Sequence, residues 1–159
     1  MHLKLILAHI LIFIITTLGF TYLYFDIENE ILQRISVVFH LTIVLILYVV
    51  SGFLATGKTK IFDFKNYYII ALIGFILWLI AVLNSPTDMN WKNGIGGILW
   101  LLHNTYISGI ELPIFFSFGI SIKNIKLQIV ILLIITIIPS LLQAYGGFLK
   151  IKQNKKNIA

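Results

Sequence analysis

The chain has 159 residues, of which 59% are hydrophobic and 11% are charged, and its mean hydropathy is +0.99. A surface of that composition would aggregate in water, which excludes a soluble globular domain. The net charge of +6 comes from basic residues in short connections and in the tail, where anionic lipid is the expected counterion and nucleic acid is not. Without cysteine, disulfides, thiolate metal sites and cysteine nucleophiles are impossible.

Long apolar runs predict helices that cross a membrane. A helix of roughly 20 apolar residues, rising about 1.5 Å per residue, spans the roughly 30 Å hydrocarbon core. We therefore predict an all-α, polytopic transmembrane helical bundle with five spans, which forms a single integral membrane domain over residues 1–159. In chain order the predicted spans are residues 3–25, 35–55, 67–83, 95–120 and 125–149, followed by a basic tail at residues 150–159.

The connections differ in charge, which bears on orientation. Residues 26–34 are acidic, whereas residues 56–66 carry Lys58, Lys60 and Lys65. The positive-inside rule places the second connection in the cytoplasm. Five full crossings would then put the basic tail on the opposite side, so the charge rule alone leaves the orientation open.

The fourth run offers another way to place the tail. If residues 95–120 entered and left from the outer side, the tail would lie on the cytoplasmic side with residues 56–66. Glycines and Pro113 interrupt this run, and proline removes a backbone donor. Interrupted helices also occur as full membrane spans. We predict five spans, with the fourth segment kinked. The alternatives are a re-entrant fourth segment and an inverted or mixed insertion of the five spans.

Ionisable residues inside the runs mark the candidate site. Each costs about 2.5 to 3.5 kcal/mol on membrane insertion scales, so it needs a partner, a cavity or a function. Counting residues from the span ends places His40, His103 and Gln143 at one depth, and His9 and Glu111 together in the opposite half. Asn104 shares a helical face with Glu111. The candidate polar intramembrane site is thus Glu111, His9, His103, His40, Asn104 and Gln143.

Glu111 carries the sharpest expectation. Gly109 and Pro113 flank it and predict a kink or a short unwinding of the helix. Such a break requires protein or water around it, so we expect Glu111 to face the bundle interior. Its expected neighbour is His9, either directly or through water. The alternative is that the histidines and Gln143 act only as hydrogen-bonding groups between helices.

Zinc-protease, nucleophile-elbow, phosphate-loop and dinucleotide signatures are all absent, so no catalytic residue and no enzyme activity are predicted. We expect a non-enzymatic plasma-membrane protein that acts as a transport component or as an accessory or immunity partner of another membrane protein. Membrane lipid, a second copy or another membrane protein are the expected partners. The eleven lysines against one arginine, with 32 isoleucines, suggest an AT-rich bacterial genome.

The alternative function is a membrane redox protein. In it, His40 and His103 would pair as ligands of haem or of a transition metal, because imidazole suits both. The main prediction has no metal and no cofactor.

Overall fold

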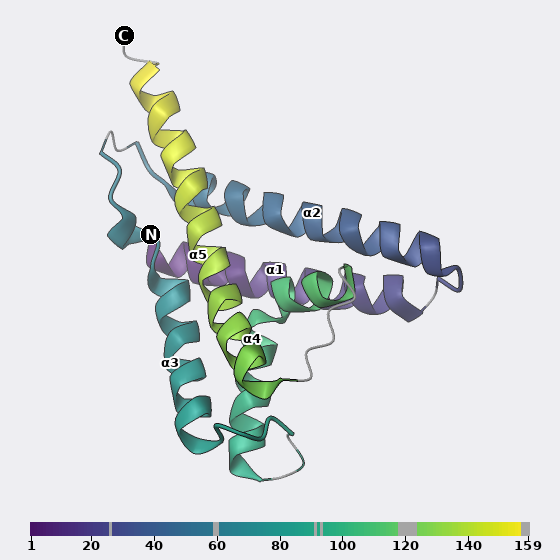
Figure 1. The fold of residues 1–159 in the computed structure, drawn as a ribbon. Helices are drawn as coiled ribbons and strands as arrows, with labels where there is room; N and C mark the ends of the chain where they lie inside the picture. The colour runs from purple at the N-terminus through teal and green to yellow at the C-terminus, as the bar shows by residue number, and fades with distance from the viewer. Residues whose placement is uncertain (26, 59–60, 91, 93, 118–123, 157–159) are drawn as a thin grey trace.

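The computed structural model describes residues 1–25, 27–58, 61–90, 92, 94–117 and 124–156 (Figure 1). Five α-helices occupy most of these residues, and the described part contains no strand. The prediction of an all-α fold is confirmed. The helices are α1 (His2–Phe25), α2 (Glu30–Ala55), α3 (Ile69–Asn84), α4 (Ile95–Ser117) and α5 (Ile125–Lys156), with the short 3-10 helix η1 (Phe64–Asn66) before α3.

Three of the helices, α1, α2 and α5, are long and apolar enough to cross a membrane. The chain is therefore an integral membrane protein. The other two fall short of the predicted five spans for different reasons. α3 has only 16 residues, and α4 carries His103, Asn104 and Glu111 within its length, which lowers its hydropathy.

Two helix boundaries differ from the prediction. α2 begins at Glu30 and not at residue 35, because the Asn29 side chain caps it by accepting hydrogen bonds from the backbone N–H groups of Ile31 and Leu32. At the other end of the chain, α5 continues to Lys156, seven residues beyond the predicted end at 149. Lysines favour the last turns of a helix because they complement its dipole. Residues 118–120 of the predicted fourth span lie outside the described residues.

α3 runs antiparallel to both α4 and α5. Trp100 Nε1 on α4 donates to the carbonyl of Ser85, directly after α3, and Trp78 Nε1 in the second half of α3 donates to the carbonyl of Ile129. These bonds join the second half of α3 to the first turns of α4 and α5. Both helices therefore begin at the same end of the molecule (Figure 1). Parallel starts of α4 and α5 are the arrangement that the re-entrant alternative predicts for the fourth segment.

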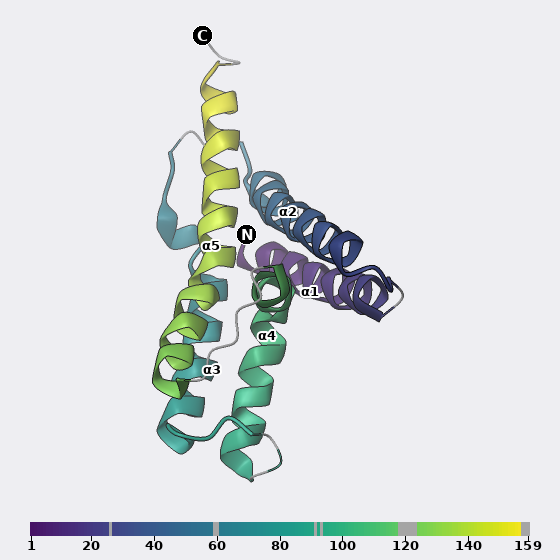
Figure 2. The same cartoon turned by 45° about the vertical axis from the view of Figure 1, so that its right-hand side comes forward.

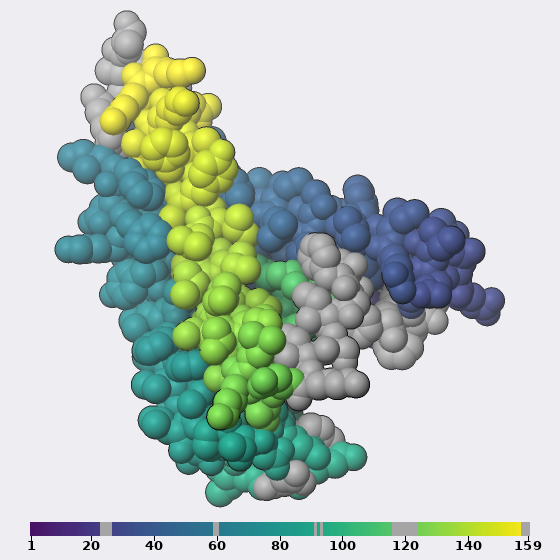
Figure 3. All heavy atoms as spheres, in the orientation of Figure 1, coloured from purple at the N-terminus to yellow at the C-terminus, as the bar shows by residue number. Residues whose placement is uncertain are grey.

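The α1–α2 hairpin lies crosswise to the layer formed by α3, α4 and α5, as Figures 1 and 2 both show. In the space-filling view the hairpin extends to one side of that layer (Figure 3). The two layers meet where α2 crosses α5. A Cβ on Gly52 would lie 1.9 Å from the backbone oxygen of Gln143, and one on Gly146 would lie 1.8 Å from that of Val49. The helices thus touch backbone to backbone, and the predicted helical bundle is built as two crossed layers (Figures 1 and 2).

α4 changes direction in its last turns (Figures 1 and 2), in agreement with the predicted kink. Pro113 lies in this part of the helix and cannot donate to the carbonyl of Gly109. Gly109 itself packs against α1, where an added Cβ would lie 3.5 Å from the Cα of Phe13. The kink carries the end of α4, with Glu111, onto the α1–α2 hairpin.

Basic residues gather at one end of the molecule. Asn154 Nδ2 donates to the Gly57 carbonyl, and Lys150 Nζ lies 4.7 Å from the ring centroid of Phe53, so the end of α5 adjoins the end of α2. The start of α1 adjoins them through a hydrogen bond from Gln143 Nε2 to the Leu5 carbonyl. We call this the basic end, and its lysines among the described residues are Lys4, Lys58, Lys65, Lys150, Lys152, Lys155 and Lys156.

Candidate functional site

His9 is the centre of a buried polar junction between α1, α2 and α4. Its Nδ1 lies 2.9 Å from the Tyr48 hydroxyl, and its Nε2 lies 3.1 Å from the backbone carbonyl of Tyr106. A carbonyl can only accept, so Nε2 carries the proton and the neutral ring accepts from Tyr48 at Nδ1. Both ring nitrogens are therefore engaged. The junction fixes the crossing of α1 over α4.

Tyr106 extends this junction to α3. Its ring lies 4.6 Å from the His9 ring, between centroids, and its hydroxyl donates to the carbonyl of Ile70. Sequence reasoning missed both Tyr48 and Tyr106. No spacing rule pairs Tyr48 with His9 across 39 positions. Their hydroxyls are nonetheless the partners that make burial of His9 inexpensive.

Glu111 lies on the kinked part of α4 and is 9% exposed, so the protein covers nearly all of it, as predicted. Its carboxyl group has no hydrogen bond or ion pair with any described residue. A direct hydrogen bond between Glu111 and His9 is not formed, because Tyr48 and Tyr106 occupy both nitrogens of that ring. The contact through water, which the sequence equally allowed, stays a prediction. Glu111 is thus a buried carboxyl group that its own chain leaves without a partner.

A groove runs beside Glu111 between α1 and α4. One hollow of about 280 Å³ contains Glu111, and a second of about 300 Å³ contains His9. Phe13 and Thr105 line both hollows, so the two lie next to each other. We call the whole the α1–α4 groove. Its polar lining is Asn104, Thr105, Ser108 and Glu111 from α4 and Thr17 and His9 from α1.

The α4 lining follows from helical periodicity. Asn104, Ser108 and Glu111 are spaced four and three residues apart, which puts them on one face over two turns, as the sequence predicts. Across the groove, the buried Thr17 Oγ1 has no hydrogen-bond partner within the described part of the chain. Buried polar groups are nearly always satisfied. The unpartnered carboxyl of Glu111 and hydroxyl of Thr17 therefore leave hydrogen-bonding capacity for a group from outside the chain.

His103 lies on another face of α4, against α5. Its Nε2 is 3.0 Å from Thr136 Oγ1, and its Nδ1 is 3.4 Å from the side-chain oxygen of Asn104. The Thr136 hydroxyl donates to the Leu132 carbonyl, so it accepts from His103 Nε2. This histidine holds α4 to α5. Through Asn104 it also adjoins the α1–α4 groove.

Gln143 and His40 lie at separate crossings, although they were predicted at one depth with His103. Gln143 Nε2 donates to the Leu5 carbonyl and lies 3.2 Å from Ser51 Oγ. His40 packs against Gly19, where an added Cβ would lie 2.8 Å from its Cε1. Residues 40 and 51 are about 16 Å apart along α2, at 1.5 Å per residue. The predicted tier of three residues is therefore not formed, because the crossed layers break the equal-depth counting.

A bis-histidine metal or haem site does not fit this arrangement. His40 contacts α1, whereas His103 is bonded through Nε2 to Thr136 on α5. A bridging iron or copper would require both rings to face one point. Within the described residues, no three His, Cys, Asp or Glu side chains are grouped as metal ligands. His9 and His103 make hydrogen bonds between helices, whereas the buried Nε2 of His40 has no hydrogen-bond partner among the described residues.

The chain matches no family model, and comparisons with curated proteins and with solved structures find no significant similarity. Of the six predicted site residues, Glu111, Asn104 and His9 line the α1–α4 groove, and His103 adjoins it. Gln143 and His40 belong to other contacts between the layers.

Proposed function

We propose that this protein is a small, non-enzymatic transport component of a bacterial plasma membrane, and that Glu111 binds a cation or a proton in the α1–α4 groove. The single observation that supports this proposal is the buried carboxyl of Glu111, which has no partner among the described residues and opens onto a groove. Intramembrane carboxylates in polar-lined cavities are typical of ion and proton pathways.

The rest of the groove suits the same role. Thr17, Asn104 and Ser108 offer oxygen atoms beside the carboxyl, which are the ligands that hard cations prefer. No basic side chain lines this part of the groove, so a positive charge there would meet no repulsion. Most of the polar lining is on α4, and the remaining lining residues are mainly apolar. Such a lining favours binding of a small cation over an anion.

One chain supplies only an open groove and not a closed path. A complete pathway would need a second wall, which a second copy of this chain or another membrane protein would contribute. The protein is therefore proposed to work as a homo-oligomer or as a subunit of a larger assembly. An accessory role, in which a basic residue of the partner binds Glu111, is the second candidate and rests on the same unpartnered carboxyl.

Flux measured in proteoliposomes tests the transport proposal. The purified full chain would be reconstituted, a membrane potential imposed, and the entry of protons and of sodium followed with dyes inside the vesicles. We expect Glu111→Gln to reduce the flux at least tenfold. The matched control is Glu28→Gln, which neutralises an exposed carboxylate outside the groove and should leave the flux unchanged.

The outcomes separate the two candidate roles. Equal flux through the wild type and Glu111→Gln would contradict the placement of the site. No flux of either ion above empty vesicles would contradict the transport role. In that case the accessory role would be examined by comparing the oligomeric state of the wild type and Glu111→Gln in lipid nanodiscs.

A further inference from the structure

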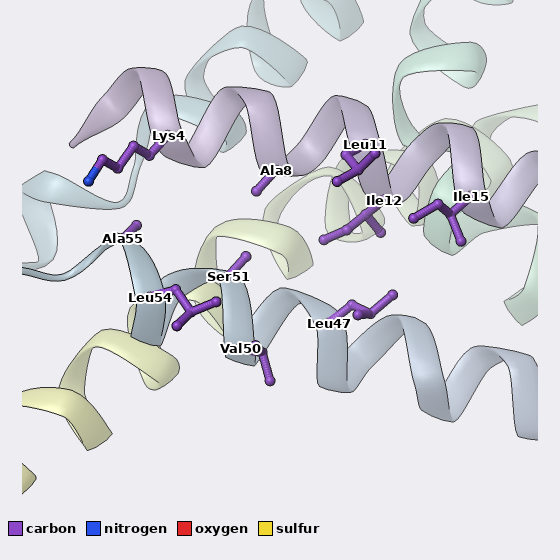
Figure 4. Close-up of a pocket in the computed structure, with 10 residues that line it drawn as sticks. All are labelled: Lys4, Ala8, Leu11, Ile12, Ile15, Leu47, Val50, Ser51, Leu54 and Ala55. Carbon is purple, nitrogen blue, oxygen red and sulfur yellow. The ribbon is translucent and has the colours of Figure 1, made fainter.

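A second groove lies between α1 and α2, away from Glu111 (Figure 4). It has a volume of about 300 Å³, which is the lower end of the range for ligand pockets. Small side chains leave the space between the two helices: Ala8 lies on the α1 side, and Ser51 and Ala55 lie on the α2 side. Leucine, isoleucine and valine side chains form the rest of its wall. The groove is therefore almost wholly apolar and elongated along two antiparallel helices.

One charged residue belongs to this groove, and it stands at one end. Lys4 lies opposite Ala55 with its ammonium group directed beyond the end of the groove (Figure 4). Its ammonium has no hydrogen bond or ion pair with any described residue. The other lysines of the basic end, including Lys58 after α2, add positive charge on the same side. In the connection of residues 56–66 the single acidic residue is Asp63, which caps η1.

We propose that this groove binds one anionic phospholipid, with an acyl chain between α1 and α2 and the headgroup phosphate on Lys4. The groove is bordered by side chains that face the bilayer, such as Leu11 and Leu54, which are 58% and 72% exposed. An acyl chain can enter it from the lipid, whereas a soluble ligand would have to cross that lipid. Burial of the chain gives little selectivity, because lipid tails are as apolar as the groove.

Charge complementarity selects the headgroup. A zwitterionic headgroup offers a phosphate together with a positive charge, which the basic end repels. An anionic headgroup such as phosphatidylglycerol carries only the negative charge. Juxtamembrane lysines attract such lipids, and one well-placed lysine changes the affinity about fivefold. The site is independent of Glu111 and of the transport proposal.

Native mass spectrometry of the full chain in detergent tests the site. The probes are phosphatidylglycerol and phosphatidylcholine with identical acyl chains, each added at the same concentration. We expect the wild type to retain one phosphatidylglycerol about fivefold better than phosphatidylcholine, and Lys4→Gln to lose that preference. The matched control is Lys126→Gln, which removes an exposed lysine from the opposite end of α5 and should keep it. Equal retention in the wild type, or an unchanged preference in Lys4→Gln, would overturn the proposal.

Inorganic phosphate distinguishes a lipid site from a phosphate site. Millimolar phosphate should leave phosphatidylglycerol bound, because the acyl chain holds the lipid in the groove. Displacement of the lipid by phosphate would contradict the acyl placement. Fluorescence provides a second, independent readout, because the chain has no cysteine and single thiols can be labelled selectively.

One label is attached at Leu54→Cys, which lines the groove, and the other at Leu83→Cys on α3, which does not. The two leucine side chains are equally accessible, at 72% and 73% exposed. Phosphatidylglycerol with brominated acyl chains should quench the label at residue 54 more strongly than brominated phosphatidylcholine does. At residue 83 the two lipids should quench equally. Both substitutions replace exposed side chains, so folding is preserved. Equal quenching by the two lipids at residue 54 would overturn the site.

Discussion

The Tyr48 hydroxyl lies 2.9 Å from His9 Nδ1, and this hydrogen bond joins α2 to α1 inside the protein. The opposite nitrogen of the same ring donates to α4 at the Tyr106 carbonyl. One imidazole thus connects three helices. It does so as a neutral group with both nitrogens satisfied, which is the least costly way to bury histidine in an apolar environment.

Replacing Tyr48 by Phe should destabilise the protein by about 1 to 2 kcal/mol, because Nδ1 of the buried His9 loses its donor. Thermal unfolding in detergent measures the change. Tyr145→Phe is the matched control, since Tyr145 is 55% exposed, and it should alter stability by less than about 0.5 kcal/mol. Equal effects of the two substitutions would argue against the His9 junction.

The crossing of α2 and α5 predicts a strong effect of a single methyl group. In Gly52→Ala the new Cβ would meet the backbone oxygen of Gln143 at 1.9 Å, so the helices must separate. We expect a loss of about 1 to 3 kcal/mol, as for overpacked cores. Gly57→Ala adds the same methyl group where no atom lies within 4 Å, and its stability should stay close to the wild type. A harmless Gly52→Ala would mean that this crossing is looser than described.

Thr136→Val tests the contact between α4 and α5. The substitution keeps the shape of the side chain but removes the hydroxyl that accepts from His103 Nε2. Interhelical hydrogen bonds in membranes average about 0.6 kcal/mol, so we expect a small loss of stability near that value. The His103 imidazole signals in NMR spectra should shift, whereas those of His40 should not. Unchanged His103 signals would contradict the hydrogen bond.

The basic end predicts that the C-terminal ends of α2 and α5 lie on the same side of the membrane. Asn154 Nδ2 lies 3.2 Å from the Gly57 carbonyl, so single cysteines at 57 and 154 should react with an impermeant maleimide from the same side of intact cells or oriented vesicles. Five alternating spans would place them on opposite sides. Labelling of the two positions from opposite sides would refute the proposed arrangement of α4 and α5.

The sequence predicted the helices well and their arrangement poorly. Run length and hydropathy located all five, since these are local properties of the chain. Equal-depth counting failed for His40 and Gln143 because it assumes helices that cross the membrane side by side, whereas α1 and α2 lie crosswise to α5. The close approach at Gly52 and Gly146 decides that crossing, and neither glycine stood out in the sequence.

In the candidate site, too, the residues on one helix were predictable and their partners on other helices were not. The α4 face with Asn104 and Glu111 was predictable, because helical periodicity alone places those residues together. The partners of His9 were not, since Tyr48 and Tyr106 come from other helices and only tertiary packing brings them near. Glu111 was correctly expected to be buried, but its lack of a partner in the chain emerges only from the full set of contacts.

Access of water to the α1–α4 groove tests the central claim most directly. Ser108 lines the groove beside Glu111, so Ser108→Cys should react with a charged, membrane-impermeant thiol reagent in proteoliposomes. Ile76→Cys on α3 provides the control, because Ile76 is 46% exposed but lines neither hollow of the groove, and a thiol in lipid stays unreactive. We predict labelling at residue 108 and none at residue 76. If neither cysteine reacts, the groove is dry, and Glu111 cannot serve as a binding site for a cation or a proton that arrives from water.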